Sequence, residues 1–197
     1  MFISMEGIDG CGKTLMTEKL CLYLKEKGID YVRTREPGGC AVSDRCRDIL
    51  LNSEYLDNRC EVMLFLASRA QHVSEVIRPA IKEGKWVITD RYADSFVAYQ
   101  SFGRGFDLDR ITEFNDFACY SFYPDITFYL DIDVETSLAR QTDPDRISVS
   151  DNTFYQKIKD GFDYLCDRYT DRFVRIDASL NVEEVFEQIL FHIKDKI

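Results

Sequence analysis

The chain has 197 residues, of which 45% are hydrophobic, 30% charged and 13% aromatic, and this composition excludes a disordered protein. It carries 25 basic and 35 acidic residues, and the resulting net charge of −10 argues against a non-specific binder of nucleic acid or of anionic membranes. A phosphate-binding site in such a chain needs a local cluster of positive charge, because the overall negative charge repels phosphate. We expect residues 1–197 to form a single domain.

The cysteines and the N-terminus indicate the cellular compartment. The seven cysteines are odd in number and form no C-x-x-C pair, which disfavours a disulfide framework and a structural zinc site. The first residues lack a basic stretch followed by an apolar one, so no signal peptide is visible. No apolar run approaches the roughly 18 residues of a membrane span. We therefore expect a cytoplasmic protein without membrane contact.

Short apolar runs alternate with longer helical patterns. The first half is predicted to contain strands at residues 2–5, 29–33 and 86–89, and helices at 13–27, up to residue 51, and at 60–82. The second half is predicted to contain helices at 92–102 and 109–122, a strand at 126–130, a short helix from residue 134, a helix to about residue 168, a strand at 173–176 and a helix to residue 194. This alternation predicts an α/β fold with a parallel sheet of about five strands, covered on both faces.

A glycine-rich segment joins the first strand to the first helix. It has the phosphate-loop pattern G-x-x-x-x-G-K-T and consists of Gly7, Ile8, Asp9, Gly10, Cys11, Gly12, Lys13 and Thr14. Glycines let successive N–H groups turn towards phosphate oxygens, and the following helix directs its positive end at them. Lys13 can then reach the β- and γ-phosphates, and Thr14 can offer its hydroxyl to Mg²⁺. A dinucleotide fingerprint does not fit, because Leu15 stands where it needs glycine.

Two side-chain pairs indicate a second substrate beside this loop. Asp90 and Arg91 follow the strand at 86–89, and the carboxyl ends of parallel strands face the ligand crevice. The aspartate can hold Mg²⁺, directly or through water, and the arginine can bridge the phosphates of two substrates. Phe65 and Arg69 lie four residues apart on one helix, which suits a stacked base and a phosphate. By spacing alone, however, an ordinary amphipathic pair is the simpler interpretation.

A polar segment at about residues 140–150 is predicted to form a lid. It contains Arg140 and Arg146 between two predicted helices. Such a segment can close over transferring phosphoryl oxygens, although most surface arginines are simply solvated.

Several motifs occur in the order and at the spacing of one enzyme family. They are residues 6–14 (EGIDGCGKT), residues 34–39 (TREPGG), Phe65 with residues 69–72 (RAQH), residues 90–92 (DRY) with Ser95 and residues 98–100 (AYQ), residues 103–105 (GRG) and residues 145–147 (DRI). In these motifs the chain resembles the thymidylate kinases, which are P-loop nucleoside-monophosphate kinases. The resemblance implies a three-layer αβα fold of the P-loop NTPase type. It also implies phosphorylation of dTMP to dTDP by ATP and Mg²⁺, for dTTP supply, and a homodimer.

The resemblance further implies residue roles in the dTMP pocket. Asp9 is expected to meet the deoxyribose 3′-hydroxyl, Phe65 to stack on thymine, and Gln100 to contact the edge of the base. Arg69 is expected on the thymine or phosphate side, and Arg91 at the acceptor phosphate. Supporting members of the pocket are Glu36, Arg47, Ser95 and Tyr99.

The expected catalytic groups are cationic. Because dTMP is already an anion, no strong general base is required, and catalysis should consist mainly of positioning and charge neutralisation. Lys13 and Arg91 are two of these groups, with Mg²⁺ at Thr14 and Asp90. The phosphate loop contains no arginine, so the chain is similar to the bacterial type with a lid arginine. Arg146 is our first choice and Arg140 our second.

Other functions remain open from the residues alone. One is a P-loop kinase that acts on nucleosides or on other monophosphates. Another is a nucleotide-dependent switch that hydrolyses slowly, but the D-x-x-G and N-K-x-D segments of a GTPase switch do not occur outside the phosphate loop. The net charge disfavours a DNA-binding ATPase.

Overall fold

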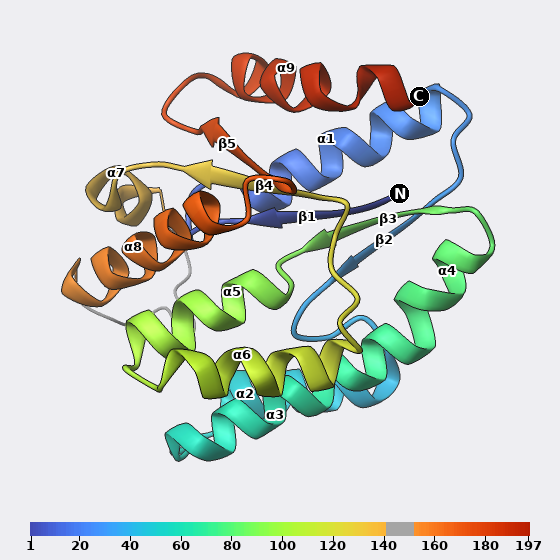
Figure 1. Cartoon of the computed structure of the whole chain (residues 1–197). Helices are drawn as coiled ribbons and strands as arrows, with labels where there is room; N and C mark the ends of the chain where they lie inside the picture. Colours follow the sequence, from blue (N-terminus) through green and yellow to red (C-terminus); the bar gives the residue numbers. More distant parts are fainter. Residues whose placement is uncertain (141–151) are drawn as a thin grey trace.

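The chain folds into a five-stranded parallel sheet between two layers of helices (Figure 1). A computed structural model describes residues 1–140 and 152–197. The strands lie in the order β2-β3-β1-β4-β5, with the bounds β1 Phe2–Glu6, β2 Tyr31–Arg35, β3 Trp86–Asp90, β4 Ile126–Asp131 and β5 Phe173–Asp177. The predicted α/β class with a parallel sheet of about five strands is confirmed.

The helices occur where the sequence predicts them, with shifts at their ends. The first half contains α1 Lys13–Glu26, α2 Ala41–Asn52, α3 Asn58–His72, the π-helical turn η1 Val73–Ile77 and α4 Arg78–Lys82. The second half contains α5 Ala93–Val97, the π-helical turn η2 Ala98–Gly103, α6 Leu108–Cys119, α7 Val134–Ala139, α8 Asn152–Arg168, α9 Val182–Ile193 and the 3₁₀ turn η3 Lys194–Lys196. Among the helices of residues 1–140 and 152–197, none combines the length and apolar character needed to span a membrane.

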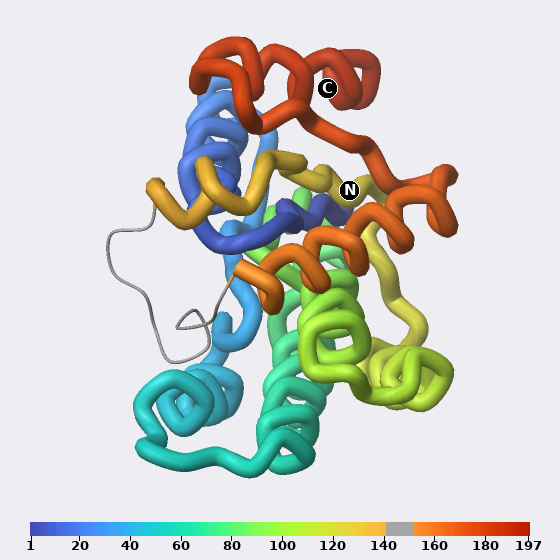
Figure 2. The backbone as a smooth tube through the Cα atoms, turned by 90° about the vertical axis from the view of Figure 1, so that its left-hand side faces the viewer, coloured from blue at the N-terminus to red at the C-terminus, as the bar shows by residue number. Residues whose placement is uncertain are grey.

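Helices cover both faces of the sheet. α1 and α9 lie on one face, and α5 lies with α8 on the other (Figure 1). In the perpendicular view, α2 and α3 run side by side at the end of the molecule away from α9 (Figure 2). A cavity at the carboxyl ends of β2 and β3 is lined by residues of α2 and α3 and by residues of the phosphate loop.

The second strand begins two residues later than predicted. Gly28 adopts a left-handed conformation with φ of 71°, and the N–H of Ile29 donates to the carbonyl of Leu24 at 2.9 Å. Ile29 therefore closes helix α1 in a glycine-terminated cap instead of starting the strand. At its other end β2 extends two residues beyond the prediction, to Arg35, which pairs in register with Asp90.

The core fixes β1 between its neighbours. All five residues of β1 are buried, and its three apolar side chains are divided between two apolar clusters. Ile3 and Met5 pack on the side of α1, whereas Phe2 packs with Val87 and Tyr92 on the opposite side. Each large apolar side chain buried in this way stabilises the fold by about 1.5–3 kcal/mol. Burial on both faces holds the ends of β1 and β3 in register, and the phosphate loop starts from that edge.

Candidate active site

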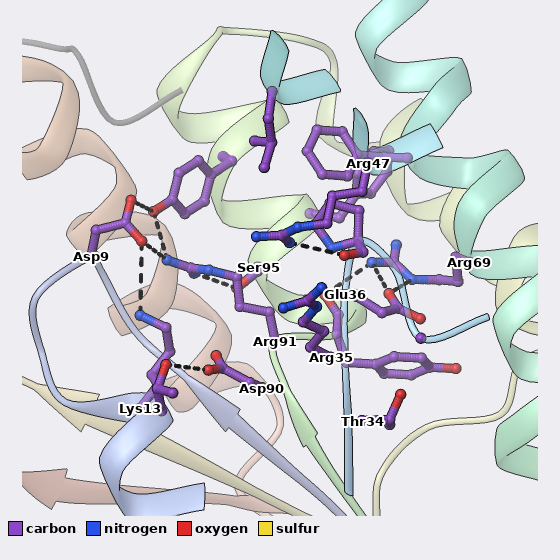
Figure 3. A pocket seen from close by; sticks show the side chains of 18 of the residues that line it. Asp9, Lys13, Thr34, Arg35, Glu36, Arg47, Arg69, Asp90, Arg91 and Ser95 are labelled. Carbon is purple, nitrogen blue, oxygen red and sulfur yellow. Dashed lines mark hydrogen bonds and ion pairs between the residues drawn. The ribbon is translucent and has the colours of Figure 1, made fainter. Parts of the chain in front are cut away.

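A cavity of about 1020 Å³ opens at the carboxyl ends of β1, β2 and β3. It collects most of the residues that the sequence predicts: Asp9, Gly10, Gly12, Lys13, Thr14, Glu36, Arg47, Phe65, Arg69, Asp90, Arg91, Ser95, Tyr99, Gln100 and Arg140. Gly7, Ile8 and Cys11 belong to the loop but not to the lining. Residues 141–150 of the predicted lid, Arg146 among them, lie outside the described residues. Figure 3 shows the labelled side chains converging on this space from both sides.

The phosphate loop closes around Lys13. Gly7 has φ of 139°, and a Cβ there would lie 2.7 Å from the carbonyl oxygen of Leu130, so only glycine fits. The buried Nζ of Lys13 donates to the carbonyl of Ile8 at 2.8 Å, and Ser137 of α7 donates to the carbonyl of Asp9. The loop is thus fixed by β4 and α7 as well as by its own glycines.

Thr14 and Asp90 meet at the mouth of this loop. The hydroxyl of Thr14 donates to Oδ2 of Asp90 at 2.6 Å, because the register of β1 and β3 places Asp90 beside Met5 (Figure 3). Elsewhere in the described ranges, no group of three or more His, Cys, Asp or Glu residues is arranged to hold a metal. A hydroxyl and one carboxylate suit Mg²⁺, which binds through few protein oxygens and keeps water and phosphate ligands.

Arg91 is held in an unusual backbone conformation. Its φ is 66°, a left-handed value that non-glycine residues rarely adopt and that concentrates at functional sites. Its guanidinium donates to the carbonyl of Gly7 at 2.9 Å, to Ser95 Oγ at 2.8 Å and to the Tyr99 hydroxyl at 3.1 Å, and it forms an ion pair with Asp9. Burial opposes the charge, but Tyr99 and Asp9 outweigh it and keep the pKa of Arg91 well above its ordinary value.

Asp9 lies between two cations. Besides its ion pair with Arg91, a carboxylate oxygen is 4.0 Å from Nζ of Lys13 (Figure 3). Its other oxygen accepts from the hydroxyls of Tyr99 at 3.1 Å and Tyr155 at 3.3 Å. Tyr155 comes from α8 and was not predicted as a site residue, since nothing in its local sequence marks it. The carboxylate therefore connects the phosphate loop, β3 and α8 at one point.

Arg69 is bound into the wall of the cavity by Glu36. Its side chain is almost fully buried, with Nε 2.8 Å from Glu36 and Nη1 donating to Asn115 at 2.6 Å. His72 Nδ1 lies 2.8 Å from the other oxygen of Glu36, which follows β2. Burial acts against ionisation of Glu36, but the charge of Arg69 and the hydrogen bond from His72 prevail and lower its pKa. Neither His72 nor Asn115 was predicted as a site residue.

Aromatic and cationic side chains line the rest of the wall. The rings of Phe65 and Phe96 have centroids 6.2 Å apart, and Phe65 remains partly exposed towards the cavity. Arg47 donates to the carbonyl of Pro37 at 3.0 Å and, with Arg35, adds positive charge. Arg35 was not predicted. These arginines make a locally cationic site in a chain of net charge −10.

Gln100 is held by a buried carboxylate behind the cavity wall. It lies in the π-helical turn η2, a type of distortion that is frequent at functional sites. Its Nε2 donates to Glu61 of α3 at 3.2 Å. Arg104 donates to both oxygens of Glu61, at 2.7 and 3.0 Å. Neither Glu61 nor Arg104 was predicted as a site residue.

The carboxylate of Glu6 accepts a hydrogen bond from Ser95. This fully buried carboxylate accepts from Ser4 Oγ at 2.6 Å, from the Tyr92 N–H at 2.7 Å and from Ser95 Oγ. Burial, with the charge of Asp94, raises its pKa to about 7 against the opposing effect of the hydrogen bonds. Since Ser95 also accepts a hydrogen bond from Arg91, Glu6 is linked to Arg91 through Ser95.

The structure also describes Cys11 and Arg140, two further residues of the predicted site. Cys11 is 2% exposed, as suits a small residue packed in the turn. Arg140 donates to the carbonyl of Ala178 at 3.1 Å, which ties the end of α7 to the segment after β5.

Comparison with known proteins identifies the family. Residues 5–189 match the family model described as thymidylate kinase. The chain is 42% identical over 203 residues to a thymidylate kinase of Geobacillus sp. (strain WCH70), covering 100% of this chain and 97% of that protein. It is 40% identical over 195 residues to one of Clostridium novyi (strain NT), covering 95% of each. The crystal structure of thymidylate kinase from Ehrlichia chaffeensis superposes with a TM-score of 0.83 at 34% identity, covering 98% of both chains. The chain therefore belongs to the thymidylate kinase family.

Proposed function

We propose that the chain transfers the γ-phosphoryl group of ATP to the 5′-phosphate of dTMP, giving ADP and dTDP. The observation that carries this proposal is that one cavity is lined by two sets of residues with different chemistry. One is the phosphate loop with Lys13, and the other holds Phe65, Gln100 and several arginines. Arg91 lies between these two sets of residues, on the proposed path of the phosphoryl group from ATP to dTMP (Figure 3).

The donor side is assigned to the loop. Its N–H groups and the ammonium of Lys13 bind and orient the β- and γ-phosphates. Thr14 and Asp90 would hold Mg²⁺, which neutralises phosphate charge and orients the γ-phosphoryl group when bound.

The acceptor side is assigned to Arg91. Its fork-shaped guanidinium suits the 5′-phosphate of dTMP, and Ser95 and Tyr99 fix its direction. Charge neutralisation by Arg91 and Lys13 lets two anions approach in line. We assign further stabilisation of the transferring group to Arg146, with Arg140 as the second choice.

We assign the nucleoside part of dTMP to the side chains on the acceptor side of the cavity. Asp9 is proposed to accept from the 3′-hydroxyl, Phe65 to stack on thymine and Gln100 to contact its edge. Arg69 supports the base or phosphate side. Glu36 and Arg47 complete the pocket through the contacts described above.

A homodimer in the cytoplasm completes the proposal. Met63 of α3 is 54% exposed and Phe117 of α6 is 86% exposed, on two helices that pack together. Large apolar side chains on adjacent helices favour association of two copies. The seven cysteines are free thiols, as expected in a reducing compartment. Analytical ultracentrifugation of the wild type and an M63E/F117E variant tests the dimer.

The reaction is tested by ADP release with ATP and Mg²⁺. The acceptors are dTMP, dUMP, UMP, dCMP, AMP, GMP and thymidine, with an assay without acceptor as the control. We expect strong turnover that depends on dTMP and is lost in K13M. Turnover with thymidine alone would assign a nucleoside kinase, and slow release without any acceptor would assign a switch protein.

A further inference from the structure

The side-chain amide of Gln100 has one bonded end and one end without a partner. Gln100 lines the cavity and is 2% exposed. Its nitrogen donates to Glu61, whereas its oxygen Oε1 is buried and accepts no hydrogen bond within the described part of the chain. A buried acceptor without a partner destabilises a protein, so such an atom calls for an explanation.

The orientation of this amide is set by Glu61. A carboxylate only accepts hydrogen bonds, so it takes the NH₂ end of the amide and rejects the oxygen end. Arg104 makes two bonds to the same carboxylate, whose side chain is 1% exposed, and this keeps Glu61 in its place. The flip that an isolated glutamine makes freely is therefore disfavoured, and the amide keeps Oε1 and its second N–H for a further partner.

An acceptor in a buried wall selects bases by their donors. Thymine and uracil carry an N–H at position 3, whereas cytosine carries a lone pair there. A base with N3–H satisfies Oε1, but cytosine would place two acceptors against each other. A site built for a hydrogen bond rejects analogues that lack the matching group much more strongly than an apolar site does.

We propose that Glu61, held by Arg104, is a positioning residue that sets base specificity by fixing the oxygen of Gln100 towards the base. Glu61 does not itself line the cavity. The inference rests on the proposed phosphorylation of dTMP. It goes beyond it by naming the residues that separate thymine and uracil from cytosine.

The same contacts would also serve as a purely structural tie between α3 and η2. The two roles have different consequences. Loss of a structural tie lowers stability, and lowers kcat/KM for every acceptor by a similar factor. Loss of amide orientation changes the ratio of kcat/KM values between acceptors that differ at N3.

The test compares kcat/KM for dTMP, dUMP and dCMP in the wild type and in E61Q. Glutamine at residue 61 can donate as well as accept, so Gln100 can turn either end to the base. The preference for dUMP over dCMP is expected to fall about tenfold or more in E61Q. The preference for dTMP over dUMP should stay within about twofold, because both bases carry N3–H.

The swapped variant E61Q/Q100E is the matched control. It keeps one carboxylate and one amide beside Arg104, and a carboxylate at residue 100 offers only acceptors to the base. We expect this variant to recover the preference for dUMP over dCMP. It also decides the question if E61Q alone does not fold.

Three results would overturn the proposal. They are an active E61Q with an unchanged ratio, a swapped variant that has lost the preference, and a wild-type protein that uses dUMP and dCMP equally. Failure of the proposed function is a separate outcome, since the wild-type protein would then not turn over dTMP at all.

Discussion

Replacing Glu6 with glutamine should change how the stability of the folded chain depends on pH. The pKa of Glu6 lies near 7 against an ordinary value of 4.5, chiefly because the side chain is buried and secondly because of Asp94. Ser4, Ser95 and Arg91 act in the opposite direction. Between these pH values the unfolded chain releases a proton that the folded chain keeps, so folding becomes less favourable as pH rises.

The magnitude follows from the two pKa values. At about 1.36 kcal/mol per pKa unit, ionising Glu6 in the folded state costs about 3 kcal/mol in full. Roughly 2 kcal/mol of this loss falls between pH 5.5 and pH 8, because the unfolded carboxyl is already ionised at the lower pH. The wild type should therefore lose about 2 kcal/mol relative to E6Q over this interval.

Urea unfolding followed by the fluorescence of Trp86, the chain's one tryptophan, measures the difference. Titrating groups that do not interact with Glu6 are common to the two proteins and cancel. E54Q, which removes an exposed carboxylate, controls for the change in net charge. Parallel pH profiles of the wild type and E6Q, or a wild type that gains stability on E6Q with rising pH, would refute the argument.

Three further changes test the site, and a fourth, G84A, is the control for one of them. R91A should lower kcat/KM for dTMP about 100-fold or more, with a fall in kcat, and a change in KM alone would restrict Arg91 to substrate binding. G39A should lower the free energy of unfolding by about 3 kcal/mol or more, because φ is 95° and a Cβ would lie 2.6 Å from Nε2 of His72. The control G84A, with φ of 77° and nothing within 4 Å, should cost only about 1 kcal/mol in the same urea unfolding assay. D90N should raise the Mg²⁺ concentration for half-maximal rate about tenfold with the fold intact, and an unaltered Mg²⁺ dependence would remove Asp90 from the metal site.

Local patterns predicted the elements and the phosphate loop. Apolar periodicity and glycine placement are written in neighbouring residues, so all five strands were found. The start of β2 was missed because an apolar residue, Ile29, serves the helix cap instead of the strand. The loop was found because its function requires specific residue types at fixed spacing, such as Gly7 and Lys13.

Buried polar partners could not be read from the sequence. Tyr155 reaches Asp9 across 146 residues, and Arg104 reaches Glu61 across 43. Such contacts depend on how α8, η2 and α3 pack, which no local pattern encodes. Family resemblance pointed to Gln100 as a base contact but left its amide orientation open, because that depends on Glu61.

The position of β1 in the sheet has a consequence for synthesis of the chain. β1 is made first, yet its two neighbours are β3 and β4, which end at Asp90 and Asp131. On the ribosome β1 therefore lacks its neighbour β3 until Asp90 has been translated and its neighbour β4 until Asp131 has been translated, a period in which exposed strand edges favour aggregation. The phosphate loop also lacks a contact until later in synthesis, because Ser137 of α7 donates a hydrogen bond to the carbonyl of Asp9. A nascent chain that stops before α7 would carry the whole loop sequence without the hydrogen bond from Ser137.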